Sequence, residues 1–181
     1  LIYRAKCRPQ TDEELDEYCK FVLGISFPKT CHPDCQHREI PCTPPFRVLS
    51  DMFFAKYPLI ILKASRGSGK SVLLATCCLI EQICLDAEVL VIAGSEEQSK
   101  VVFNYINPNK SRFVDKFWNC PFMPKLLRNK QSEQQTYSQI VSGGVIKCLP
   151  ASETAVLGQR PSRLRIDECD KAKIDLIESA I

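Results

Sequence analysis

The chain has 181 residues and a formal net charge of +3, with 45% hydrophobic and 25% charged residues. These values are typical of a globular protein with a sizeable core, and so small a charge does not by itself indicate nucleic-acid binding. No apolar run approaches the ~18 residues of a membrane span, and the first residues lack the apolar core of a signal peptide. We therefore expect a cytoplasmic protein without a membrane partner.

The cysteine count is high and odd, at eleven. Three of these residues, Cys77, Cys78 and Cys84, fall in an apolar segment, where cysteine behaves as a small hydrophobe. A secreted disulfide framework is therefore not expected. The chain begins without methionine and ends at Ile181 in an apparently helical stretch, so we expect it to be a fragment of a longer protein.

Residues 1–43 are predicted to form an N-terminal extension, part helical and part rich in cysteine and histidine. Thr11 followed by Glu14 is a capping box, and Leu15, Tyr18 and Val22 follow at helical spacing. We expect this helix to pack its single apolar face on the flank of the domain.

The polar loop over residues 31–42 crowds several metal-ligating side chains together. Zinc takes four such ligands, and the candidates are Cys31, Cys35, His37 and Cys42, with Cys7 as a further one. The spacing lacks the paired C-x₂-C knuckles of common zinc sites, so reduced, unliganded residues are the alternative.

Residues 44–181 are predicted to form the second and larger unit. It opens with a helix capped by Thr43, with proline in its first turn, and with Phe46, Leu49 and Phe53 on its buried face. Because this helix lies just upstream of the glycine loop described next, Phe46 and Arg47 are candidates for contact with an adenine ring. Core packing of Phe46 and a solvated Arg47 are the alternative.

Residues 58–71 have the pattern of a phosphate-binding loop. The run 58–62 predicts a buried strand, and residues 71–86 predict an apolar helix. Between them, Gly67 and Gly69 lack Cβ and can adopt positive φ close to phosphate oxygens. The start of the helix adds unpaired amides and a partial positive charge.

Two side chains at the end of this loop have predicted roles in binding ATP. Lys70 is expected to reach the β- and γ-phosphates, and Ser71 is expected to hold Mg²⁺ through its hydroxyl. Ala64 stands where the pattern G-x-x-x-x-G-K-[ST] has its first glycine, and the alternative is a simple strand-to-helix turn. The predicted nucleotide-binding residues are Ser65, Arg66, Gly67, Ser68, Gly69, Lys70 and Ser71.

Strands and helices then alternate, which predicts a parallel sheet with helices on its faces. Residues 88–93 form a β-branched apolar run, and Ser95 with Gln98 caps the next helix. Residues 108–128 are aromatic and basic, which fits either DNA contact or buried aromatics on amphipathic helices. Residues 135–149 predict a hairpin around Gly143 and Gly144.

The last predicted strand, residues 163–167, leads into two acids and is similar to a Walker B sequence. Leu164 and Ile166 alternate with two arginines, so that the two kinds of side chain occupy opposite faces. Asp167 is then expected to bind Mg²⁺, and Glu168 to polarise the attacking water. Two acids on a solvated turn are the alternative. Together the motifs predict an α/β P-loop NTPase of the RecA/ASCE type, incomplete at its C-terminus.

The order of the motifs resembles the ATPase domain of the large terminase subunit of tailed phages. The resemblance rests on an arginine within the phosphate loop, the glycine hairpin with Leu149-Pro150-Ala151-Ser152 and Gly158-Gln159-Arg160 after it, and then the acidic strand. It implies that Arg66 contacts the γ-phosphate and couples hydrolysis to movement, and that Glu168 is catalytic.

The resemblance also implies partners and a location. It implies an ATP-hydrolysing ring of identical subunits that drives double-stranded DNA into procapsids, with the portal protein and the small terminase subunit, in the cytoplasm of a bacterial host. The coupling motif and the metal-dependent nuclease domain are expected beyond residue 181.

Two other classes of protein remain open. A superfamily-two helicase also fits the phosphate loop, and Asp167 to Asp170 fits its D-E-x-D box. Against it stand Arg66 and the hairpin before the acidic strand. A cysteine-rich module that binds ATP without turnover is the non-enzymatic alternative.

Overall fold

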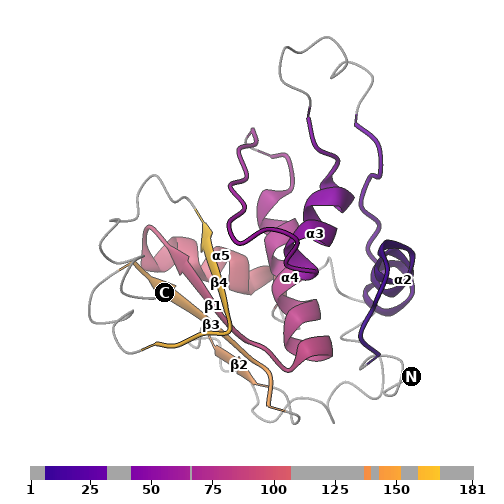
Figure 1. Ribbon diagram of the computed structural model, residues 1–181. Helices are drawn as coiled ribbons and strands as arrows, with labels where there is room; N and C mark the ends of the chain where they lie inside the picture. The colour runs from indigo at the N-terminus through magenta and orange to yellow at the C-terminus, as the bar shows by residue number, and fades with distance from the viewer. Residues whose placement is uncertain are drawn as a thin grey trace.

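The computed structural model describes residues 7–31, 42–65, 67–106, 137–139, 143–151 and 159–167. Figure 1 shows the described helices to one side of a twisted sheet. In chain order the elements are α2 (Asp12–Tyr18), the π-helical turn η1 (Cys19–Leu23), α3 (Pro45–Phe53), α4 (Lys70–Leu85), β1 (Glu88–Ala93), α5 (Glu96–Ile106), β2 (Tyr137–Gln139), β3 (Val145–Pro150) and β4 (Arg163–Asp167).

The sheet is mostly parallel, as the alternation of strands and helices predicts. Its strand order is β2-β3-β1-β4. β1 lies between β3 and β4 and is parallel to both, with Val91 opposite Cys148 on one side and Arg165 on the other. β2 pairs antiparallel with β3, which confirms the predicted hairpin. The α/β class is therefore confirmed.

The two faces of the sheet differ in what covers them. One face packs against α4 and α5 and contributes Val89 and Val91 of β1 and Ile146 and Cys148 of β3 to the large apolar core. The opposite face carries a small second cluster, formed by Leu90, Ile92, Leu149, Ala151, Leu164 and Ile166. Within the described part of the chain, helices pack on one face only, so the expectation of helices on both faces is met in part.

α4 is the central helix of the core. It begins at Lys70 and ends at Leu85, close to the predicted bounds, and Asp86 closes it with φ of 50°. It is buried over most of its length, including Cys77 and Cys78. Burial raises the pKa of both thiols, so these cysteines behave as the small hydrophobes that the sequence predicts. No helix in the described residues is long and apolar enough to cross a membrane.

The N-terminal helix shares this core. Thr11 Oγ1 accepts a hydrogen bond from the Glu14 amide at 3.2 Å, which confirms the predicted cap. Leu15 of α2 and Leu23 of η1 lie in one cluster with residues of α3 and α4. The described part of the extension is therefore packed into the same core as the larger unit.

α3 begins differently from the prediction. Pro44, not Thr43, is its cap residue, and no side chain caps the helix. Proline in the first turn presets the helical φ without needing a hydrogen-bond partner, so the helix starts without the threonine. Phe46, Leu49 and Phe53 are buried, as expected of its apolar face.

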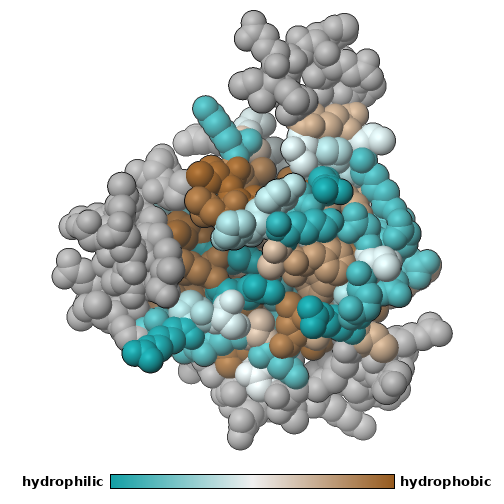
Figure 2. Space-filling model, viewed as in Figure 1, coloured by the Kyte–Doolittle hydropathy of each residue, from teal (hydrophilic) through white to brown (hydrophobic). Residues whose placement is uncertain are grey.

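The predicted strand over residues 58–62 is wrong. Residues 59–65 have no regular secondary structure, and Leu59 and Ile61 are 73% and 77% exposed. A strand exchanges hydrogen bonds with a neighbour, and these residues pair with no strand of the described sheet, so β4 remains its edge strand. The hydrophobic surface in the upper middle of Figure 2 lies over this segment.

Gly144 lies close against Gln82 of α4. Gln82 Nε2 donates to the Gly144 carbonyl at 3.3 Å. A Cβ on residue 144 would lie 2.1 Å from the Gln82 backbone oxygen, so only glycine lets β3 start this close to the helix.

Gly144→Ala is expected to destabilise the fold by about 1–3 kcal/mol, because β3 or α4 must shift to make room for the methyl group. The midpoint of urea unfolding should fall while the slope with denaturant stays constant, since the change acts on the native state. An unchanged midpoint would show that this approach of β3 to α4 carries no constraint.

Candidate nucleotide-binding site

The two predicted halves of the site lie at the same edge of the sheet. Only Asp86 and Ala87 join α4 to β1, so the helix runs antiparallel to the strand. α4 is about 24 Å long and β1 about 20 Å, from their rises per residue. The start of α4 therefore lies level with the carboxyl end of β1, where Asp167 of β4 pairs beside Ala93 (Figure 1).

The glycine loop has the conformation that its residue types require. Gly67 and Gly69 have φ of 75° and 85°, in the left-handed region that favours glycine. No atom lies within 4 Å of the position that a Cβ would take at either residue. Glycine is therefore favoured at these two positions by the backbone angle and not by a lack of space, since the space beside the loop is open.

Lys70 folds back over this loop. Its Nζ donates to the carbonyl oxygens of Ala64 at 2.8 Å and Ser65 at 2.9 Å. An ammonium group has three donors, so these two bonds leave a third direction for an anion. Ala64, which replaces the usual first glycine, supplies one of the two carbonyls.

The start of α4 suits a negatively charged ligand. Its cap residue is Gly69, no side chain caps the helix, and no acidic residue lies in the first turn. The first amides of a helix have no intrahelical acceptor and carry partial positive charge. Ser71 lies in this turn and is half-buried.

Oxygen ligands for a metal ion come from both halves of the site. Ser71 offers a hydroxyl and the half-buried Asp167 a carboxylate, and Mg²⁺ prefers oxygen ligands of these kinds. Over the described ranges, no group of three or more His, Cys, Asp or Glu residues is placed to hold a metal ion. Arg66 and Glu168, the predicted catalytic residues, lie outside the described residues.

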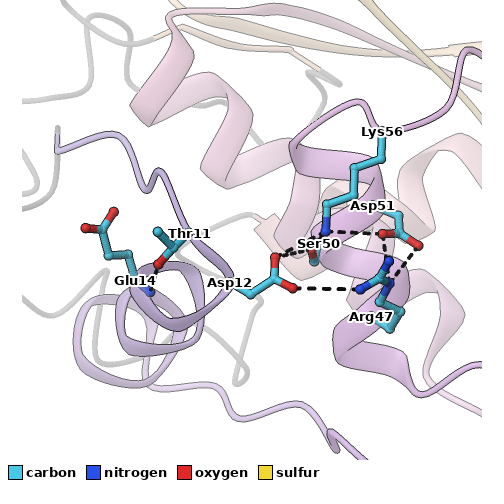
Figure 3. Close-up of polar contacts among 7 residues, drawn as sticks. All are labelled: Thr11, Asp12, Glu14, Arg47, Ser50, Asp51 and Lys56. Carbon is cyan, nitrogen blue, oxygen red and sulfur yellow. Dashed lines mark hydrogen bonds and ion pairs between the residues drawn. The ribbon is translucent and has the colours of Figure 1, made fainter.

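The predicted adenine-contact residues make other contacts. Phe46 is 7% exposed in the core, and Lys29 Nζ lies 5.1 Å from the centre of its ring. Arg47 Nε lies 3.0 Å from Asp51 Oδ1, and Arg47 Nη1 lies 4.0 Å from Asp12 Oδ2 (Figure 3). The Asp51 contact is an ion pair within α3, and the Asp12 contact joins α3 to α2. Phe46 therefore packs in the core, and Arg47 forms ion pairs.

Asp12 joins α2 to α3 through a second set of contacts. Its Oδ1 accepts from Ser50 Oγ at 2.6 Å and from Lys56 Nζ at 3.2 Å (Figure 3). The Ser50 hydrogen bond, followed by Lys56 and Arg47, lowers the pKa of Asp12. Lys56 starts the segment that leads to the glycine loop, so this network anchors the beginning of that segment.

The predicted zinc ligands are only partly described. Cys31 Sγ donates to the Cys42 carbonyl at 3.0 Å, and Cys7 is exposed. Cys35 and His37 lie outside the described residues. A zinc site therefore stays a prediction.

Sequence reasoning missed Glu81, which is fully buried in the middle of α4. Arg165 donates a hydrogen bond to its Oε1, and Arg163 Nε lies 3.4 Å from the same atom. Burial raises the pKa of Glu81 to about 7, and the charges of Arg165 and Arg163 oppose this shift. The signal was present as a glutamate inside an apolar helix and two arginines on one face of a strand. This contact explains why arginine stands in the acidic strand.

No protein-family model matches the chain, and the comparisons with curated proteins and with solved structures gave no match.

Proposed function

We propose that this chain is a Mg²⁺-dependent ATPase domain of the P-loop NTPase type. The observation that carries the proposal is the position of the Lys70 ammonium. It lies over a loop with two left-handed glycines, at the start of an uncapped helix, and at the sheet edge where Asp167 ends β4. Backbone amides, a lysine and a carboxylate at one edge suit a nucleoside triphosphate with its metal ion.

The roles of the residues follow from this placement. The loop amides and Lys70 hold the phosphates, and Ser71 and Asp167 are the protein ligands of Mg²⁺, which supplies positive charge against the charge that develops on the phosphates. A magnesium ion keeps several waters and takes further ligands from the phosphates, so two protein oxygens fit it without a cluster of three acids. Glu168 orients the attacking water for in-line displacement, and Arg66 neutralises charge near the γ-phosphate.

The finer proposal is the motor domain of a viral DNA-packaging terminase. Its support is the order of the motifs, together with the β2–β3 hairpin, which precedes the acidic strand β4. Double-stranded DNA, a portal protein, a small terminase subunit and a ring of identical subunits at the procapsid are then the partners. A superfamily-two helicase is the second candidate, and the acids at positions 167, 168 and 170 favour it.

Lys70→Ala is expected to weaken ATP binding by about 10- to 100-fold, since hydrogen bonds from a charged donor contribute about 1.5–3 kcal/mol. Isothermal titration of the purified chain with ATP and Mg²⁺ measures the change. Lys63→Ala is the matched control, because Lys63 is an exposed lysine in the same segment. Equal losses in the two variants would mean that only the general positive charge matters and would contradict the proposed loop.

A further inference from the structure

β4 contributes nothing to the large apolar core. The sheet residues in that core come from β1 and β3. On its face toward α4, β4 instead carries Arg163 and Arg165, while Leu164 and Ile166 lie in the small cluster on the opposite face. Within the described residues, the side-chain contacts between β4 and α4 are therefore polar: both arginines lie at Glu81, and Arg165 also has a hydrogen bond with Cys77.

This link has a defined geometry and little exposure. The Glu81 side chain is fully buried, and those of Arg165 and Arg163 are 16% and 30% exposed. Both guanidinium groups approach one carboxylate oxygen, Oε1. A buried ion pair contributes little net stability compared with apolar residues of similar volume. Removing one partner alone nevertheless destabilises the fold, because the other charge stays buried without compensation. The contact is thus better suited to setting the relative position of two elements than to stabilising the fold.

The elements that it joins carry the two halves of the proposed site. Glu81 lies eleven residues after Lys70 on the same helix, about 16 Å along it. Residues 163, 165 and 167 share one face of β4 because side chains alternate along a strand. Asp167 therefore continues the row of the two arginines toward the sheet edge, while Ser71 lies at the matching end of α4.

We propose that Glu81 is a positioning residue: by holding Arg165 and Arg163 it sets the separation between Asp167 and Ser71, so that one divalent cation on a bound nucleotide contacts both. This inference rests on the proposed nucleotide site and extends it. Glu81 touches neither the nucleotide nor the cation in this scheme. It acts through the position of β4.

The test is the effect of Mg²⁺ on ADP affinity, measured by calorimetric titration with Mg²⁺ and with EDTA. The ratio of the two affinities is the enhancement due to the cation. Glu81→Gln keeps the shape of the side chain but removes its charge. We expect ADP affinity in EDTA to stay within about twofold of the unsubstituted chain, because Lys70 and the loop are unchanged, and the Mg²⁺ enhancement to fall at least fivefold. Arg165→Lys keeps the charge but loses the planar fork. Its Mg²⁺ enhancement should lie between those of the unsubstituted chain and Glu81→Gln.

Gln82→Leu is the matched control. Gln82 is the next residue, is equally buried, and donates to the Gly144 carbonyl just before β3. Its replacement should lower the melting temperature while the Mg²⁺ enhancement is retained. Arg163→Gln removes the more exposed of the two arginines and provides a milder variant if Glu81→Gln does not fold; it should reduce the enhancement in the same direction.

The outcomes separate this inference from the proposed function. Full Mg²⁺ enhancement in Glu81→Gln, or an equal loss in Gln82→Leu, would overturn the positioning role. The positioning role would also be overturned if the unsubstituted chain bound ADP with the same affinity in Mg²⁺ and in EDTA. Failure of the unsubstituted chain to bind ADP or ATP at all would instead overturn the proposed function.

Discussion

Glu168→Gln is expected to reduce ATP hydrolysis at least 100-fold while leaving ATP binding intact. Glutamine has the size of glutamate but cannot take a proton from the attacking water, and a positioned general base contributes about 10²- to 10⁴-fold to a rate. Steady-state phosphate release, with and without double-stranded DNA, gives the rate, and titration with ATP gives the affinity.

Asp170→Asn is the matched control for this variant. It removes a carboxylate two residues farther along the chain and should leave hydrolysis within a few-fold of the unsubstituted rate. A comparable loss in Asp170→Asn would favour the D-E-x-D box of a helicase over a terminase. Unimpaired hydrolysis in Glu168→Gln would show that the assignment of the acidic strand is wrong.

Arg165→Met is expected to destabilise the fold by about 1 kcal/mol more at pH 8 than at pH 5, because it leaves the buried Glu81 carboxylate without its main charged partner. Of its two arginine partners, Glu81 then keeps Arg163, at 3.4 Å from its Oε1. Urea unfolding at pH 5 and pH 8 measures this loss, and its dependence on pH identifies the cause.

The direction of the pH dependence follows from the pKa of Glu81, which burial raises to about 7 from an ordinary 4.5. A carboxyl group with a raised pKa stabilises the folded state below its unfolded pKa, and that contribution is lost as pH rises through the folded value. Because Arg165 opposes the shift, its removal raises this pKa further. The loss in Arg165→Met should therefore be small at pH 5 and grow toward pH 8.

A double variant separates the buried charge from lost packing. Glu81→Leu combined with Arg165→Met replaces both charged groups by apolar ones and should recover most of the stability lost at pH 8, because buried ion pairs are often replaced without cost. A loss in Arg165→Met that is the same at both pH values, or that the second substitution does not reverse, would assign the effect to packing.

Much of the fold follows from local patterns. The apolar segment that becomes α4, the β-branched run of β1 and the Ser95 cap before α5 each contain their own signal. Ser95 Oγ accepts from the Gln98 amide at 3.2 Å, as predicted. In the candidate site, Gly67 and Gly69 adopt the positive φ that the loop pattern requires. Angles, caps and helical periodicity depend on neighbours within a few residues, so sequence alone reveals them.

Other features depend on neighbours far away in the chain. Residues 58–62 are apolar enough for a strand, but a strand also needs hydrogen-bonded pairing, and these residues pair with no strand of the described sheet. For Phe46 the sequence favours a core position over contact with an adenine ring, but only the structure shows its burial and its contact with Lys29.

The sequence by itself determined the glycine loop, the lysine that follows it, the alternation of β4 and the α/β class, since each depends on backbone angles or on the spacing of side chains. Only the tertiary structure decided that the loop and Asp167 lie at one sheet edge, and that Glu81 lies beneath Arg163 and Arg165. The physical reason is that a charged residue in an apolar helix is stable only when a partner from elsewhere in the chain comes to it. No pattern along the sequence specifies which partner that is.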